Sequence, residues 1–191
     1  MFMNETIELL RRRRSLPPQG MVGPGPGPAE IETLLTIAAR VPDHGKLTPW
    51  RFLVFEGAAR LRAGAIAAGI AEADDPALPD ARRQAELTRF SHAPLVIAVI
   101  SRAAPHAKIP EWEQVLSAGA ACMNLVVAVN AIGYVAGWVT EWCAYDRRFC
   151  AAIGLRDDEK IAGFVHIGRP NMVSEDRRRP ALAEVVSYFP A

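Results

Sequence analysis

Hydrophobic residues recur along this chain with two different periods, and the changes of period mark where strands and helices are expected. Two continuous apolar runs rich in Val and Ile, at 94–101 and 161–168, are typical of strands buried on both faces, and the first is expected to be central. Residues 51–56 and 133–140 are expected to form further strands. Apolar residues at helical spacing predict helices over residues 29–40, 58–73, 81–90, 110–132 and 146–153.

The N-terminal segment predicts one more helix, followed by an irregular connector. Asn4 can cap a helix whose first turn holds Glu5 and Glu8 and whose last turn holds residues 11–14, all Arg, which matches the helix macrodipole at both ends. From Pro17 to Pro28 Gly and Pro alternate, so neither a helix nor sheet hydrogen bonds are expected there. The prolines also remove the N–H donors that a dinucleotide-binding glycine loop needs.

This mixture of elements predicts an α+β fold, with a small sheet and helices packed on both of its faces, in a single domain over residues 1–191. Half of the 191 residues are hydrophobic, which is enough for one sizeable core. The most apolar stretch, 118–132, contains Asn124 and Asn130 and is short for a membrane span, so a buried helix is expected. Residues 1–14 lack the apolar centre and cleavage site of a signal peptide.

Charge and cysteine content narrow the expected partners. A formal net charge of +1 provides no overall field for nucleic acid or an acidic membrane, so a small molecule or a second copy of the chain is expected. Cys122, Cys143 and Cys150 have no CxxC spacing and no matching histidine pair, which indicates neither a disulfide framework nor a zinc site. A reducing cytoplasm is therefore the expected compartment.

Three arginine-bearing segments, 11–15, 40–50 and 176–180, are candidates for binding chemistry. An arginine and the hydroxyl of Ser15 can form part of a phosphate cradle that a distant arginine closes with a bidentate contact. The alternative is that the runs near the two chain ends are solvated charges. His44 lies in a turn before a strand, where it can either contact a cofactor or serve as a structural hydrogen bonder.

Other residue types give weaker indications. No serine lies in a GxSxG elbow, and Glu111 and Glu113 have no obvious second carboxylate, so hydrolysis by a triad or dyad is poorly supported. Three tryptophans, taken alone, are expected in the core instead of against a ligand ring: Trp112, Trp138 and Trp142.

A set of short segments follows in a characteristic order along the whole chain. They are IELLRRRRS at 7–15, RVPDHGKLTPW at 40–50, RFLVFEG at 51–57, APLVIAVI at 93–100, KIPEWEQVLSA at 108–118, GYVAGWVT at 133–140, KIAGFVHIG at 160–168 and the tail at 178–180. In this order they resemble the nitroreductase family of FMN enzymes, and in particular its small bacterial branch of NAD(P)H nitroreductases. Each segment alone is a weak indication, whereas all of them in sequence are a strong one.

The resemblance implies a nitroreductase-like fold with a small, mostly antiparallel central sheet flanked by helices. It also implies an intertwined homodimer that holds two FMN molecules at the interface, each bound by residues of both subunits. The implied activity is hydride transfer from NADH or NADPH through FMN to a nitroaromatic, a quinone or an activated alkene, in a ping-pong cycle. No catalytic side chain is then required, because the flavin carries the chemistry.

The resemblance assigns the cofactor contacts to four places in the chain. The first is Arg13, Arg14 and Ser15, with Arg13 and Ser15 on the phosphate side. The second is Arg40 and His44, which the second subunit contributes. The third is Trp138, Val139 and Thr140, along the isoalloxazine ring, and the fourth is Arg178 of the tail, near the phosphate.

Some positions depart from the family pattern. Pro17 stands where many relatives have a basic residue near the N1 and O2 edge of the flavin. Val139 replaces a frequent arginine, Thr48 replaces the more usual amide, and the Gly/Pro stretch at 20–28 is longer than typical. These changes bear on substrate and redox tuning more than on FMN binding.

Two other readings of the same sequence stay open. The fold could serve a different flavin reaction, namely reductive dehalogenation, flavin breakdown or dehydrogenation of a metabolite. The chain could also be a flavin-binding or nucleic-acid-binding module without turnover, although its near-neutral charge disfavours nucleic acid.

Overall fold

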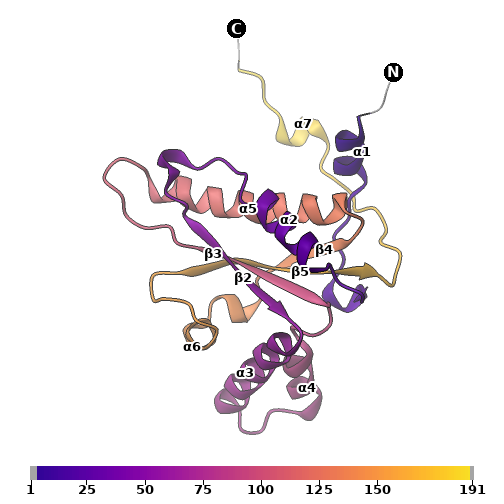
Figure 1. The fold of residues 1–191 in the computed structure, drawn as a ribbon, viewed down its shortest axis with the longest axis vertical. Helices are drawn as coiled ribbons and strands as arrows, with labels where there is room; N and C mark the ends of the chain where they lie inside the picture. The colour runs from indigo at the N-terminus through magenta and orange to yellow at the C-terminus, as the bar shows by residue number, and fades with distance from the viewer. Residues whose placement is uncertain (1–3, 190–191) are drawn as a thin grey trace.

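The computed structural model describes residues 4–189, and its centre is a sheet whose strands all pair in antiparallel fashion (Figure 1). Strand β3 (Leu95–Ser101) pairs with β2 (Trp50–Glu56) on one side and with β5 (Lys160–Pro170) on the other. Strand β5 also pairs with β4 (Val135–Val139) and with the two-residue β1 (Met21–Val22). The order β1-β5-β3-β2 confirms that the first apolar run is an interior strand.

Helices cover both faces of the sheet, which confirms the predicted α+β class (Figure 1). One face is covered by α2 (Pro28–Ala38) and α5 (Glu111–Ala131), and the other by α3 (Ala58–Asp74) and α6 (Arg147–Ala152), with α4 (Asp80–Thr88) packed on α3. The remaining helices are α1 (Glu5–Arg12) and α7 (Leu182–Val185) near the chain ends and three single turns, η1 (Pro18–Gly20), η2 (His44–Lys46) and η3 (Trp142–Ala144).

Strand β3 shows why the sheet lies between two cores. Side chains alternate between the faces of a strand, so Leu95, Ile97 and Val99 pack in the core beneath α2 and α5. The intervening residues Val96, Ala98 and Ile100 pack in the second core, beneath α3 and α6. All seven residues of β3 are buried, as the continuous apolar run predicts.

The N-terminal segment is partly as expected. Asn4 caps α1 by accepting hydrogen bonds from the backbone N–H groups of Thr6 and Ile7, as predicted. The connector prediction was wrong at the start of the Gly/Pro stretch, where η1 forms and where Met21 and Val22 pair with β5. These two residues lie between Gly20 and Gly23, where no proline interrupts the chain, so they keep the N–H donors that a ladder needs.

Helix α5 is long and apolar enough to cross a membrane by length and composition alone, but half of its most apolar window is buried inside the fold. Ala121, Leu125 and Val129 on that face have no exposed surface and pack against the sheet. The expectation of a buried core helix is therefore confirmed.

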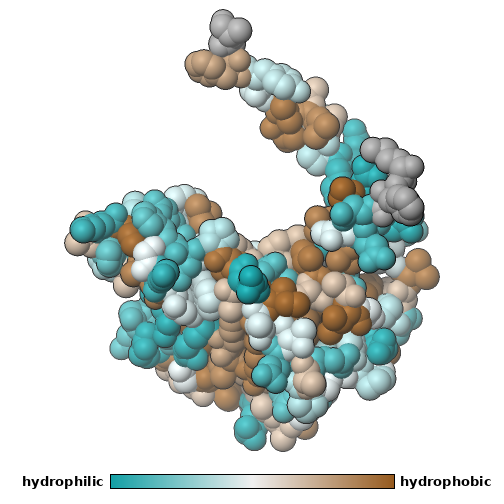
Figure 2. All heavy atoms as spheres, turned by 45° about the horizontal axis from the view of Figure 1, so that its top comes forward, coloured by the Kyte–Doolittle hydropathy of each residue, from teal (hydrophilic) through white to brown (hydrophobic). Residues whose placement is uncertain are grey.

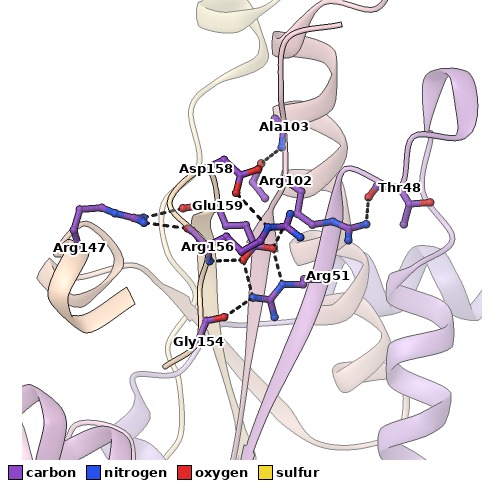
Figure 3. Close-up of polar contacts among 10 residues, drawn as sticks. Thr48, Arg51, Arg102, Ala103, Arg147, Gly154, Arg156, Asp158 and Glu159 are labelled. Carbon is purple, nitrogen blue, oxygen red and sulfur yellow. Dashed lines mark hydrogen bonds and ion pairs between the residues drawn. The ribbon is translucent and has the colours of Figure 1, made fainter. Parts of the chain in front are cut away.

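A partly buried ion pair links the strands on either side of β3 (Figure 3). Arg51 on β2 donates two hydrogen bonds to the Glu159 carboxylate, with N···O distances of 2.7 and 2.8 Å. Glu159 directly precedes β5, has no exposed surface, and also accepts a bond from the Arg156 backbone N–H at 2.9 Å. Because β3 lies between β2 and β5, this contact connects the two strands that do not touch each other.

We predict that Glu159→Gln lowers the free energy of unfolding by about 2 to 3 kcal/mol at neutral pH, because Arg51 loses its carboxylate partner. Hydrogen bonds from Arg51 hold the pKa of Glu159 at about 2, against its usual 4.5, although burial opposes them. Since folding lowers this pKa, the stabilisation is complete above about pH 4.5 and is lost as the pH falls towards 2. Urea unfolding should therefore show that the free energies of unfolding of the wild type and of Glu159→Gln converge over that pH range.

Asp158→Asn is the matched control, because Asp158 is the neighbouring carboxylate and its ion pair with Arg156 is exposed. Its effect on the free energy of unfolding should stay within about 0.5 kcal/mol. Equal losses of unfolding free energy in the two variants would contradict a stabilising role for the Arg51–Glu159 ion pair.

Candidate functional site

The residues that follow α1 lie directly beside β4. Ser15 forms a parallel bridge with Ala136, and the Leu16 N–H donates to the Ala136 carbonyl at 3.3 Å. Gly137 is needed for this approach, because a Cβ atom there would overlap the Leu16 carbonyl oxygen. The contact brings the predicted phosphate segment next to the predicted ring segment, although about 120 residues of sequence separate them.

Three arginines line a surface cavity of about 350 Å³ between the end of α1, the start of β4 and the residues after β5. Arg12 pairs with Glu8, and Arg14 pairs with Asp176 at 2.7 Å and donates to the carbonyls of Arg11 and Arg13. Within residues 4–189, Arg13 has no side-chain partner. Its guanidinium is therefore the one of the three that is available to an anion.

The tail returns to this cavity. The ion pair between Arg14 and Asp176 fixes the chain two residues before Arg178, so the Cα atom of Arg178 lies within about 7 Å of that of Asp176. Arg178 itself is exposed. Figure 1 shows the chain after β5 running back past α1, which places both ends of the chain on the same side of the molecule.

The predicted ring segment consists of Trp138, Val139 and Thr140 at the end of β4. The Trp138 side chain is 40% exposed, lies over Gly163 of β5, and donates from its indole nitrogen to the Ala162 carbonyl at 3.2 Å. A side chain at Gly163 would occupy the volume of this indole ring. Trp138 thus forms a partly open apolar surface beside β5.

The expectation that all three tryptophans lie in the core was wrong for Trp112, which is 68% exposed, and incomplete for Trp138. Trp112 lies in the first turn of α5 on the face turned away from the sheet. Trp142 is half-buried, as expected of a core residue.

Behind the ring segment lies a group of charged residues that the sequence analysis did not identify. Glu141 has a φ of 55° and a ψ of −176°, a backbone conformation that residues other than glycine rarely adopt. Arg89 forms ion pairs with both Glu141 and the buried Glu86, and Trp142 donates to Glu86 at 3.2 Å. These contacts hold the strained turn that ends the ring segment.

His166 on β5 lines a small cavity together with Val139 and Thr140 of the ring segment. Its ring stacks on Phe90, and its Nδ1 atom has no hydrogen-bond partner among residues 4–189. Burial, followed by the nearby charges of His92 and Arg89, lowers its pKa to about 4. The ring is therefore neutral at physiological pH.

His44 lies at the opposite end of α5, whereas the Arg40 backbone lies beside the C-terminal half of this helix. Their segment joins α2 to β2, and Asn124 of α5 donates to the Arg40 carbonyl at 3.2 Å. The His44 Nδ1 atom lies 2.7 Å from the Glu113 carboxylate, in the first turn of α5. Both His44 and Glu113 are exposed.

Arg13 and His44 therefore lie far apart within one chain. The Arg13 cavity is lined by Asn130 near the last turn of α5, whereas His44 contacts Glu113 in its first turn. Seventeen residues of helix between these contacts span about 25 Å, at 1.5 Å per residue. A single copy of the chain does not bring Arg13 and His44 to one ligand.

The cysteines are buried thiols. Burial raises the pKa of Cys122 and of Cys143 to about 12 and also raises the pKa of Cys150. A thiolate nucleophile is thus not available from them near neutral pH.

Comparison with known proteins decides the family. The model of the nitroreductase family matches residues 24–169. The chain belongs to the nitroreductase family. It is also 34% identical to the "Putative NAD(P)H nitroreductase YdjA" of Escherichia coli (strain K12), over 97% of this chain and 100% of that protein. The resemblance read from the sequence is therefore confirmed.

Solved structures agree on the fold. The structure of a nitroreductase-like family protein from Bacillus cereus superposes with a TM-score of 0.84 at 20% identity, over 99% of this chain and 98% of that chain. A nitroreductase from Desulfovibrio desulfuricans, solved in complex with FMN, superposes with a TM-score of 0.74 at 22% identity, over 99% of both chains. The predicted nitroreductase-like fold is thus confirmed.

Proposed function

We propose that this protein is an NAD(P)H-dependent FMN oxidoreductase of the nitroreductase type, which transfers hydride through FMN to nitroaromatic, quinone or activated-alkene acceptors in a ping-pong cycle. Membership of the nitroreductase family supports the reaction class, and the name of the Escherichia coli relative supports NAD(P)H as the donor. The relative from Desulfovibrio desulfuricans supports FMN as the cofactor. We place the protein in the cytoplasm, as a single domain over residues 1–191.

The observation that carries this proposal is the pairing of residues 15 and 16 with β4. It sets hydroxyl and guanidinium donors, which suit a phosphate, beside a partly open aromatic surface, which suits a flat ring. Arg13 and Ser15 would hold the phosphate from one side, and Arg178 of the tail would hold it from the other. Arg13 is available because it has no other side-chain partner within residues 4–189. This donor set fits a monophosphate.

The ring would lie along Trp138, Val139 and Thr140. FMN supplies the hydride chemistry when it is bound, so the protein's task is to bind, orient and leave one ring face open. The Arg89 contacts to Glu141 and Glu86 would keep the end of the ring segment in place. The buried, unreactive cysteines are consistent with a reaction that needs no thiolate.

A second copy of the chain would complete each site. Trp112, Leu116 and Met123 form an exposed apolar stripe along α5, at helical spacings of 4 and 7 residues. Two chains that pack through this stripe about a two-fold axis, with their α5 helices antiparallel, would bring the first turn of one helix to the last turn of the other. Arg40 and His44 of one subunit would then reach the Arg13 cavity of its partner.

The C-terminal arm, residues 182–189, provides a second indication of a partner. Figure 2 shows it standing off the body of the molecule, and its exposed hydrophobic residues include Leu182, Val185 and Phe189. The outer edge of β2 has no strand partner within residues 4–189, and apolar grooves flank it on both faces. An arm from the other subunit would cover such an edge, which agrees with an intertwined homodimer.

The decisive experiment is an absorption spectrum of the purified protein before and after anaerobic addition of NADH or NADPH. We expect about one FMN per chain, prompt bleaching of the flavin, and return of its absorption when a quinone or nitroaromatic is added. Bound FAD, or no uptake of FMN, would contradict the proposed cofactor. A flavin that neither nicotinamide reduces would instead indicate another flavin reaction or a binding module.

The shared site predicts that Leu116→Glu, which places a charge in the apolar stripe of α5, yields a monomer with strongly weakened FMN binding. Leu61→Glu on α3 is the control, because Leu61 is equally exposed but lies away from that stripe, and it should remain dimeric. Sedimentation and FMN titration would measure both effects. A monomeric variant that binds FMN as tightly as the wild type would rule out the shared site.

Arginines that look alike in the sequence should differ in their effect on FMN affinity. Arg13→Ala and Arg178→Ala each remove a charge-assisted hydrogen bond to the phosphate, roughly 1.5 to 3 kcal/mol, and should weaken binding about tenfold or more. Arg11→Ala and Arg177→Ala should cost no more than a few tenths of a kcal/mol, because these side chains are solvated. Equal losses in FMN titrations at fixed salt would indicate a general basic patch instead.

A further inference from the structure

The loop that carries His44 is strained and firmly held. Gly45, Lys46 and Thr48 all have positive φ angles, of 72°, 54° and 48°. The Asp43 carboxylate accepts hydrogen bonds from the N–H groups of Leu47 and Thr48, at 3.0 and 2.9 Å. Residues other than glycine persist in this region only when their surroundings determine the conformation, so the loop presents His44 in a defined place.

Helix α5 fixes the same loop from a second direction. Gly45 packs so closely on Ile109, just before α5, that a Cβ atom there would overlap the Ile109 side chain. One helical turn apart, Ser117 donates to the Pro42 carbonyl at 2.6 Å and Glu113 contacts His44 at 2.7 Å. Of these contacts, only the one from Glu113 holds a side chain of the loop. That side chain is His44, which is predicted to contact the flavin.

The chemistry of the contact determines which ring nitrogen of His44 remains available. An ionised carboxylate can only accept hydrogen bonds, so the proton of a neutral imidazole bonded to Glu113 must be on Nδ1. The Nε2 atom is then left as an acceptor and points away from Glu113. A ring without this partner would rotate freely at the surface and exchange its proton between the two nitrogens.

We propose that Glu113 is a positioning residue for His44: it holds the imidazole in one orientation and one tautomer, so that Nε2 is presented to an O–H or N–H donor of the flavin in the partner's site. This inference rests on the proposed function, in which His44 reaches the flavin of the second subunit. It adds a residue that touches neither the flavin nor the nicotinamide but acts through one that does.

Nitrogen-15 NMR of the histidine rings tests the first half of the proposal in the flavin-free protein. In a spectrum recorded at about pH 8.5, His44 should be in the Nδ1–H form in the wild type and should lose this preference in Glu113→Ala. His44→Gln identifies its signal among the four histidines. An Nε2–H form in the wild type, or no change in Glu113→Ala, would overturn the proposal.

FMN titration tests the second half. Glu113→Ala should raise the FMN dissociation constant about three- to tenfold, and Glu113→Gln less, because the amide oxygen can still accept from Nδ1–H. Glu111→Ala is the matched control, because Glu111 lies in the same helical turn and its side chain makes no hydrogen bond or ion pair within residues 4–189. It should change the constant less than twofold, although it removes the same favourable charge at the helix N-terminus.

A double-mutant cycle separates positioning from a general structural effect. In the His44→Ala background, Glu113→Ala should cause no further loss of FMN affinity, because the side chain through which it acts is absent. An additional loss in that background, or equal losses in Glu113→Ala and Glu111→Ala, would overturn the proposal. Failure of the wild type to bind FMN would contradict the proposed function instead, and the NMR result would still decide the tautomer.

Discussion

The packing of helix α5 against its surroundings is the constraint on which the rest of the structure depends. One face, with Ala121, Leu125 and Val129, is buried against the sheet and forms the larger core. A second stripe is polar, and its members at positions 113, 117 and 124 each bind the connector between α2 and β2. The third stripe is apolar and exposed. One helix therefore organises the core, places the His44 loop, and carries the apolar stripe that we propose meets a second copy.

Much of the fold follows from the sequence because period and composition determine it locally. The run 94–101 gave an interior strand, and the caps and macrodipole of 4–14 gave a helix, since both depend on neighbouring residues. Contacts between distant segments could not be predicted in this way. No local pattern relates Ser15 to Ala136, Arg51 to Glu159 or Arg89 to Glu141, because topology alone brings these residues together. Trp112 was misplaced for a related reason: its spacing indicates a helix but not which face meets solvent.

For the candidate site, too, the sequence indicates the residue types but not the contacts that they make. The resemblance named Arg13, Arg14 and Ser15 together, and the structure separates them, because Arg14 is occupied by Asp176 while Arg13 has no side-chain partner within residues 4–189. Glu113 was noted in the sequence only as a carboxylate without a second one. Its role depends on a histidine 69 residues away, and spacing along one helix cannot reveal such a partner.

Backbone strain concentrates in the two segments that would meet a ligand. Glu141 at the end of the ring segment and Lys46 and Thr48 beside His44 adopt backbone conformations that cost of order 1–3 kcal/mol each. Ion pairs and carboxylate caps from Arg89 and Asp43 offset that cost. An enzyme whose cofactor carries the chemistry gains nothing from a reactive side chain, but it does gain from rigid placement of the groups that hold the cofactor. The strain therefore lies in the loops that we propose hold the flavin.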